Sequence, residues 1–114
     1  MPFDVTLAKG IRDIVQDEPG ISEQRMFGGL AFLIDGHMAV AASGGGGILV
    51  RVDPAETSSL LAEPQVARME MGGRAMDEWV RVSSEAVVTQ DALRAWVERG
   101  VAYARSLPPK ERFA

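Results

Sequence analysis

A run of four glycines after Ser43 is the first segment of this 114-residue chain whose composition suggests chemistry. Glycine-rich loops cradle phosphates when they end in Gly-Lys-Ser or Gly-Lys-Thr and lead into a helix whose N-terminus faces the phosphate. Here the run Gly44 to Gly47 leads into Ile48-Leu49-Val50, which is typical of a strand. The segment therefore predicts a flexible hairpin loop and lacks the ending that nucleotide binding needs.

The one histidine of the chain, His37, directly follows the pair Asp35-Gly36. Metal sites gather several His, Cys or acidic ligands in convergent positions. The chain has no cysteine, and His37 with Asp35 would supply only two ligands. We therefore predict a solvent-facing turn histidine, with no metal and no other cofactor.

The serines and the paired acids lack the surroundings that catalysis needs. No serine lies in a Gly-x-Ser-x-Gly elbow, and only one histidine is present to activate any of them. The carboxylate pairs Asp17-Glu18 and Asp77-Glu78 fall in predicted turns or at helix ends. General acid–base catalysis would require one acid of a pair to be desolvated. We predict no catalytic residues and no enzymatic activity.

The spacing of apolar residues, and the prolines and glycines that end helices and strands, predict the elements that position these groups. Helical spacing covers residues 4–17, and Asp53-Pro54 begins a second helix with an N-cap acid followed by proline. The pair Asp35-Gly36 suits a two-residue hairpin turn, because both positions need a positive φ. The predicted strands are residues 30–34, 37–42, 48–52, 66–71 and 79–83, with a connection at 21–24 and a loop at 72–78.

The last predicted helix has the most regular apolar face in the chain. Thr89 can cap its start, and Leu107-Pro108-Pro109 ends it. We expect Trp96 to lie in the core and Gly100 to let the helix approach the sheet closely. The apolar face consists of Leu93, Trp96, Val97, Gly100, Val101 and Ala104.

Together these elements predict a single α+β domain over residues 1–114. Their order is α-β-β-β-α-β-β-α, and the hairpin connections make the five-stranded sheet mainly antiparallel. The helices are expected to cover one face of the sheet, which gives two layers.

Strand alternation places arginines and a tryptophan on the sheet face that the helices leave uncovered. Val50 points to the helices, whereas Leu49 and Arg51 point away. Tryptophan and arginine are enriched at interaction hot spots, so this face is a candidate protein-binding surface, most simply in a homodimer. The alternative is internal: the arginines pair with Glu70, and Trp79 packs on an aliphatic stem. The candidate surface consists of Leu49, Arg51, Arg68, Trp79 and Arg81.

Charge and composition indicate which binding partners and which cellular compartment to expect. The net charge is −4, and the only lysines are Lys9 and Lys110. Nonspecific DNA binding rests on neutralising phosphates with lysine and arginine, so we expect no direct DNA binding. No apolar run approaches the roughly 20 residues of a membrane helix, and the N-terminus lacks a secretory signal pattern. We expect a bacterial, cytoplasmic protein with protein partners and no membrane association.

The segment from Arg25 to Met38, Arg-Met-Phe-Gly-Gly-Leu-Ala-Phe-Leu-Ile-Asp-Gly-His-Met, resembles the N-terminal domain of the TfoX/Sxy family of competence regulators. The segments 48–54, 73–80, 96–97 and 103–110 agree with this resemblance in the expected order. It implies a fold similar to that of secretion chaperones and a non-enzymatic role in transcription regulation. Longer family members carry a second, helical domain, and this chain ends where that domain would begin. We therefore expect a stand-alone regulatory or adapter module.

The motif that carries this resemblance has no chemistry assigned to it. Gly28 and Gly29 suit a bulge or a close backbone approach, with Phe27 and Met76 packed beneath. The motif residues are Arg25, Met26, Phe27, Gly28, Gly29, Gly36, Arg74 and Met76.

A small anionic ligand is the alternative to a protein partner. A pocket near Arg25, Arg51 and Arg74 would bind such a ligand through guanidinium contacts. A ligand that binds only the folded state would raise the melting temperature, which separates this function from the adapter role.

We expect no duplex DNA binding by this chain alone at physiological salt. On the last predicted helix, Arg94, Arg99 and Arg105 alternate with Asp91 and Glu98, so no continuous basic stripe forms. In gel retardation with micromolar protein, the DNA should migrate freely. A retarded band that weakens as salt is raised would contradict this prediction.

Overall fold

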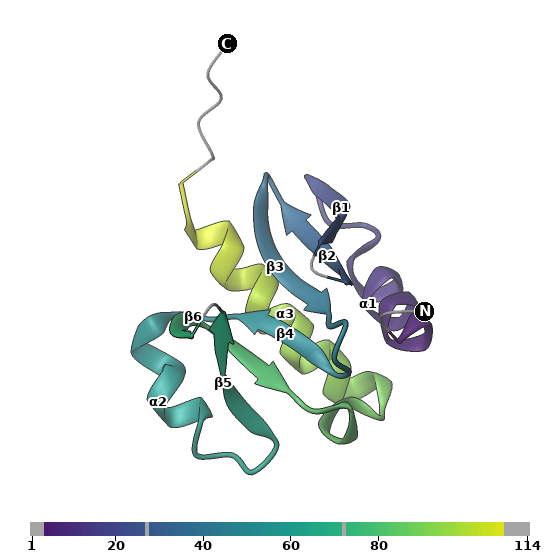
Figure 1. Cartoon of the computed structure of the whole chain (residues 1–114). Helices are drawn as coiled ribbons and strands as arrows, with labels where there is room; N and C mark the ends of the chain where they lie inside the picture. Colours follow the sequence, from purple (N-terminus) through teal and green to yellow (C-terminus); the bar gives the residue numbers. More distant parts are fainter. Residues whose placement is uncertain (1–3, 27, 72, 109–114) are drawn as a thin grey trace.

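The computed structural model describes residues 4–26, 28–71 and 73–108 (Figure 1). Within these residues the chain forms three α-helices, two short 3-10 turns and six strands. Their bounds are α1 Val5–Val15, β1 Ile21–Met26, β2 Gly29–Ile34, β3 His37–Ala42, β4 Ile48–Arg51, η1 Pro54–Glu56, α2 Thr57–Leu60, β5 Val66–Met71, β6 Arg74–Val82, η2 Ser84–Val87 and α3 Gln90–Ser106.

The six strands form one antiparallel sheet in the order β1-β2-β3-β4-β6-β5. The helix α3 packs on β3 and β4, while α1 packs on α3, as Figure 1 shows. All three helices contribute side chains to the same core, which includes Ile11, Leu60 and Val97. The predicted α+β class and antiparallel sheet are confirmed. No helix in the described part of the chain is both long and apolar enough to cross a bilayer.

The prediction of five strands is wrong, because residues 21–26 form the edge strand β1 and not a connection. Ser22, Glu23 and Gln24 are exposed, so the segment has no apolar face that marks a strand. Its extended state comes from pairing with β2, from Ile21 opposite Ile34 to Met26 opposite Gly29. The side chain of Arg12 on α1 also donates two hydrogen bonds to Glu23, at 2.6 and 2.9 Å.

The second hairpin and the second helix also differ from the prediction. The predicted loop 72–78 is mostly strand, because β6 begins at residue 74 and pairs with β5 up to the two-residue connection. The sequence predicts a second helix that ends before Pro64, whereas the structure has a 3-10 turn followed by the four residues of α2, which end at Leu60. Its start is as predicted, since Asp53 Oδ1 accepts a hydrogen bond from the Ala55 amide at 2.9 Å.

The predicted glycine turns are confirmed by the backbone angles. Asp35 has φ 51° and Gly36 has φ 85°, and they connect paired residues of β2 and β3. Gly28 has φ 76° in the connection from β1 to β2. A Cβ on Gly29 would lie 2.4 Å from the carbonyl oxygen of Ala42, so this glycine permits a close backbone approach.

The helix α3 follows the prediction in its cap and its glycine, but not in its tryptophan. Thr89 Oγ1 accepts a hydrogen bond from the Ala92 amide at 3.1 Å. Trp96 is only half-buried at the rim of the core. At about 100° per residue, Trp96 lies roughly 80° from the middle of the buried face, so the prediction that it is a core residue is wrong. The guanidinium of Arg99 lies 5.7 Å from the centroid of the Trp96 ring.

We predict that Gly100→Ala destabilises the fold by about 1–3 kcal/mol. A Cβ at this position would lie 2.4 Å from the carbonyl oxygen of Ala39, which is backbone and cannot rotate away. The helix and the sheet must therefore separate. Chemical denaturation of the wild type and the variant measures the loss.

Gly10→Ala is the matched control, because it lies in α1 and gains the same roughly 1 kcal/mol of helix propensity. Its Cβ would meet the Cδ2 atom of Leu93 at 2.7 Å, the end of a flexible side chain. We expect Gly10→Ala to cost much less than Gly100→Ala. Equal losses in the two variants would show that the backbone contact at Ala39 is not limiting.

Candidate functional site

The sheet face opposite the helices carries a second, smaller apolar cluster. Its buried members are Ala31, Leu33 and Ala41, and the half-buried Met38 and Leu49 pack against them. None of the described helices contributes to this cluster. We call this surface the open face, and we include in it the residues that continue it across β4 and β6, namely Arg51, Trp79 and Arg81.

Strand register explains why these side chains share one face. Ala31 lies opposite Ala41, Ala41 opposite Leu49, and Leu49 opposite Arg81, which gives one continuous row across four strands. Arg51 lies opposite Trp79 in the next row on the same face. Directly opposed side chains in an antiparallel sheet lie close enough to interact. The open face is therefore apolar on β2 and β3 and becomes basic on β4 and β6.

Arg68 does not belong to the open face, contrary to the predicted surface. It lies opposite Val80, a core residue, so it is on the sheet face that the helices cover. The guanidinium of Arg68 pairs with Asp77 at 2.9 Å. The pairing of β5 with β6 shifts register between Arg68 and Met69, and the alternation predicted from sequence did not include this shift.

Trp79 is on the predicted face but is buried, with 8% of its surface exposed. The guanidinium of Arg51 lies 5.9 Å from the centroid of the Trp79 ring, within the range of a cation–π contact. The internal alternative for Trp79 is thus closer to the observed packing than an exposed hot spot. Leu49 and Arg81 remain half-buried at the surface.

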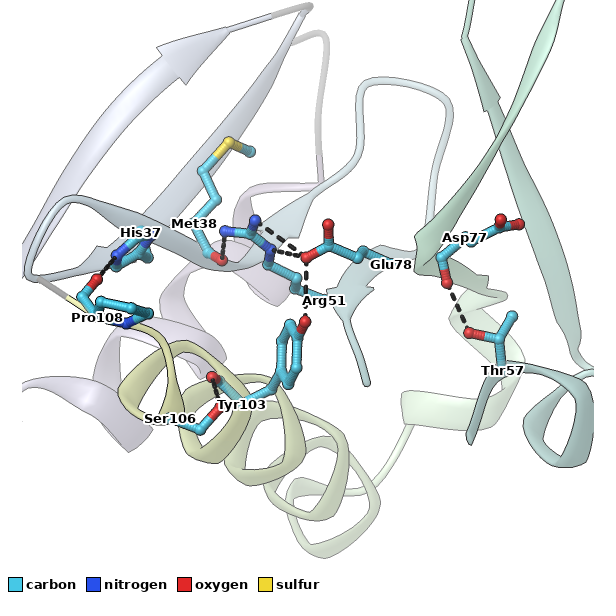
Figure 2. Close-up of polar contacts among 9 residues, drawn as sticks. All are labelled: His37, Met38, Arg51, Thr57, Asp77, Glu78, Tyr103, Ser106 and Pro108. Atoms are coloured by element: carbon cyan, nitrogen blue, oxygen red, sulfur yellow. Dashed lines mark hydrogen bonds and ion pairs between the residues drawn. The ribbon is translucent and has the colours of Figure 1, made fainter. Parts of the chain in front are cut away.

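Arg51 pairs with Glu78, whereas the internal alternative from the sequence paired the arginines with Glu70. Figure 2 shows that the Glu78 carboxylate contacts both Arg51 and Tyr103. Its Oε2 atom accepts from Arg51 Nε at 3.2 Å and from the Tyr103 hydroxyl at 3.2 Å, and Arg51 Nη2 lies 3.1 Å away. Arg51 Nη1 also donates to the carbonyl oxygen of Met38 at 3.5 Å. The network connects β3, β4, β6 and α3.

The backbone of β6 beside this network is fixed from both sides. The Val52 amide donates to the carbonyl oxygen of Glu78 at 2.7 Å. The hydroxyl of the buried Thr57 donates to the carbonyl oxygen of Asp77 at 2.6 Å. Partial burial and then the negative charge of Glu78 raise the pKa of Tyr103 above its ordinary value. Tyr103 therefore stays protonated at neutral pH, and it donates a hydrogen bond and does not act as a base.

The loop from β3 to β4 is a hairpin connection, as predicted, and is tied down by Ser43. The Ser43 hydroxyl, in a residue 5% exposed, accepts from the Gly45 amide at 3.1 Å and from Arg81 Nη1 at 2.9 Å. The Ser43 amide donates to the carbonyl oxygen of Gly47 at 3.1 Å. These bonds place the guanidinium of Arg81 against the loop.

His37 is half-buried, so it is less exposed than the solvent-facing histidine that the sequence predicts. Its Nε2 atom donates to the carbonyl oxygen of Pro108 at 2.6 Å, which connects the β2–β3 turn to the segment after α3 (Figure 2). In the described ranges, no three His, Cys or acidic side chains come together in a way that could hold a metal ion.

The structure does not bring together the arginines of the predicted anion pocket. Arg25 lies on β1 opposite Leu30, a core residue, so it is on the sheet face that the helices cover. Arg51 lies on the other face of the sheet, with β2 and β3 between their strands. The Arg74 side chain lies outside the described part of the chain, as do Phe27 and the side chains of Met26 and Met76.

Sequence reasoning missed Glu78, Tyr103, Thr57 and Ser43 as parts of this region. Each acts through a contact that joins segments at least 20 residues apart, except the bond within the glycine loop. Local patterns carry no signal for such contacts. The position of Tyr103 at the flank of the last apolar helix face was the one available indication that its hydroxyl could reach the sheet.

These features define a class: an α+β domain with helices on one face of an antiparallel sheet and an apolar-to-basic surface on the other. The family model described as the TfoX N-terminal domain matches residues 13–104, which is most of the chain. The chain belongs to this family. Comparisons with curated proteins and with solved structures found no match.

We predict that Tyr103→Phe destabilises the fold by about 0.5–1.5 kcal/mol, because it removes one hydrogen bond to a carboxylate. In a Glu78→Ala background the same substitution should cost much less, since its acceptor is gone. A double-mutant cycle from denaturation curves measures this coupling.

Glu56→Ala serves as the control background, because Glu56 pairs with Arg99 and not with Tyr103. There the cost of Tyr103→Phe should be unchanged within about 0.5 kcal/mol. Equal costs of Tyr103→Phe in all three backgrounds would show that the Tyr103–Glu78 bond contributes nothing to stability.

Proposed function

We propose that residues 1–114 act as one non-enzymatic regulatory or adapter module that works through protein–protein contacts. The open face carries this proposal. A sheet face that meets only solvent is expected to carry polar side chains. The open face instead has alanines and Leu33 at its centre. Membership in the TfoX N-terminal domain family supports a regulatory role.

A role in transcription regulation would then be indirect. The net charge of −4 disfavours contact with the phosphate backbone of DNA, and in the described part of the chain five arginines are already paired with carboxylates. The module would act in the cytoplasm by binding a protein, and any contact with DNA would come from that partner.

The first partner to test is a second copy of the chain. In a two-fold contact the same patch meets itself, so an apolar centre faces an apolar centre. The half-buried Met38 and Leu49 are the members of the open-face cluster that still reach solvent. They would be the apolar side chains that such a contact buries, with Arg81 at the margin.

Leu49→Lys is the variant that tests this surface, because it places a cation beside Arg81 on the open face. Trp79→Glu is unsuitable, since Trp79 is buried and a charge there would unfold the sheet. Val88→Lys is the matched control: the same charge is added at an apolar residue that is 79% exposed and outside both apolar clusters.

We expect the wild type and Val88→Lys to dimerise in sedimentation equilibrium at about 100 μM protein, and Leu49→Lys to stay monomeric while folded. Affinity purification from the native host should likewise recover a partner with the wild type and Val88→Lys that is lost with Leu49→Lys. A monomeric wild type excludes the homodimer. Partners recovered equally by Leu49→Lys exclude the open face as the docking surface.

A further inference from the structure

We propose that a pocket at the end of β6, around Arg81 and the glycine loop, binds an oxyanion group of a small ligand, either a carboxylate or a phosphate. The pocket has a volume of about 560 Å³. It is separate from the arginines of the predicted anion pocket, which the fold keeps apart. Residues from the β3–β4 loop, the start of β5 and the end of β6 line it, among them Gly45, Gly46, Gln65, Arg81, Ser83 and Ser84.

Arg81 carries a positive charge that the described chain does not neutralise. Five other arginines in this part of the chain have a carboxylate oxygen within ion-pair distance, at 2.6 to 3.3 Å. Among the described residues, the Arg81 guanidinium instead donates a hydrogen bond to the Ser43 hydroxyl. A half-buried cation is stabilised when an anion supplies the missing countercharge. Among the described lining residues Glu85 is the single acid, and its carboxylate is not within ion-pair distance of Arg81.

The guanidinium is also oriented before any ligand arrives. The Ser43 hydroxyl accepts from Arg81 Nη1 at 2.9 Å and is itself fixed by the Gly45 amide. A guanidinium has five N–H donors, so this bond leaves most of them for a ligand. Paired N–H groups of arginine match the oxygens of carboxylates and phosphates. Prior orientation lowers the entropy that binding must overcome.

The glycine loop exposes backbone to the pocket without side chains in the way. Gly46 and Gly47 have φ of 95° and 68°, a region that glycine adopts without strain. A Cβ on Gly47 would lie 2.3 Å from the carbonyl oxygen of Val82, so only glycine fits there. A Cβ on Gly46 would meet open space, which leaves room for a ligand to approach.

A serine beside the loop adds a second observation that points to a ligand. The hydroxyl oxygen of Ser83 is buried and has no hydrogen-bond partner in the described chain. Buried polar groups without a partner are rare in folded proteins, and an ion or ligand often satisfies them. Ser83 belongs to the same pocket lining as Arg81. Ser83 is therefore a second candidate donor to the bound anion.

The test is titration of the whole chain with two probes in turn, inorganic phosphate and succinate, followed by amide NMR signals. We expect at least one probe to shift the signals of Gly45, Gly46 and Gly47 in a saturable way. Arg81→Gln should weaken that binding about tenfold or more. Arg94→Gln removes the same charge from an exposed position on α3 and should leave binding unchanged.

Arg81→Lys separates the two ligand chemistries, because lysine still binds the more highly charged phosphate as a point charge but lacks the planar pair of donors that a carboxylate needs. Phosphate binding should largely survive this substitution, whereas succinate binding should fall as in Arg81→Gln. The signal shifts in the wild type locate the site even if a variant does not fold. The proposal is overturned if neither probe shifts the loop signals at about 10 mM, or if Arg94→Gln weakens binding as much as Arg81→Gln.

Discussion

The backbone contact between α3 and β3 at Gly100 constrains the rest of this structure. A Cβ on Gly100 would lie 2.4 Å from the carbonyl oxygen of Ala39, so helix and sheet approach as closely as a glycine allows. The side chain of Val50 borders this contact, with its Cγ1 atom 3.4 Å from the position of that Cβ, and small or β-branched residues such as Ala42 and Val97 belong to the same close-packed core. With α3 seated there, α1 and α2 complete the same core from its two sides. The described helices thus pack on one face of the sheet and leave the opposite face uncovered.

Charged side chains then connect the elements across the surface of this core. Arg12 joins α1 to β1, Arg105 joins α3 to Glu18 in the turn after α1, and Arg99 joins α3 to η1. Exposed ion pairs of this kind contribute little to stability individually. The Arg51–Glu78–Tyr103 network differs, because it is partly buried and connects the open face to α3 through one carboxylate. Arg81 differs from these arginines, because it donates a hydrogen bond to the Ser43 hydroxyl and not to a carboxylate. It borders both the open face and the glycine loop.

Predictions from the sequence succeeded where the signal was local. The caps at Asp53 and Thr89, and the positive φ values at Asp35 and Gly36, each depend on residues within a few positions of one another. The edge strand β1 has no such signal. Its exposed polar residues are extended only because β2 offers a row of backbone partners.

The sequence by itself determined the family, the α+β class, the hairpin turns and the glycine at the helix–sheet contact, because each is set by residue type or by short spacing. Tertiary structure alone decided which tryptophan is buried: Trp79 is covered within the sheet, while Trp96 lies at the rim of the core. It also decided that Arg68 leaves the open face and that Arg51 pairs with Glu78. The physical reason is register. A shift in the pairing of β5 with β6 changes which side chains share a face, and such pairing depends on segments distant in the chain.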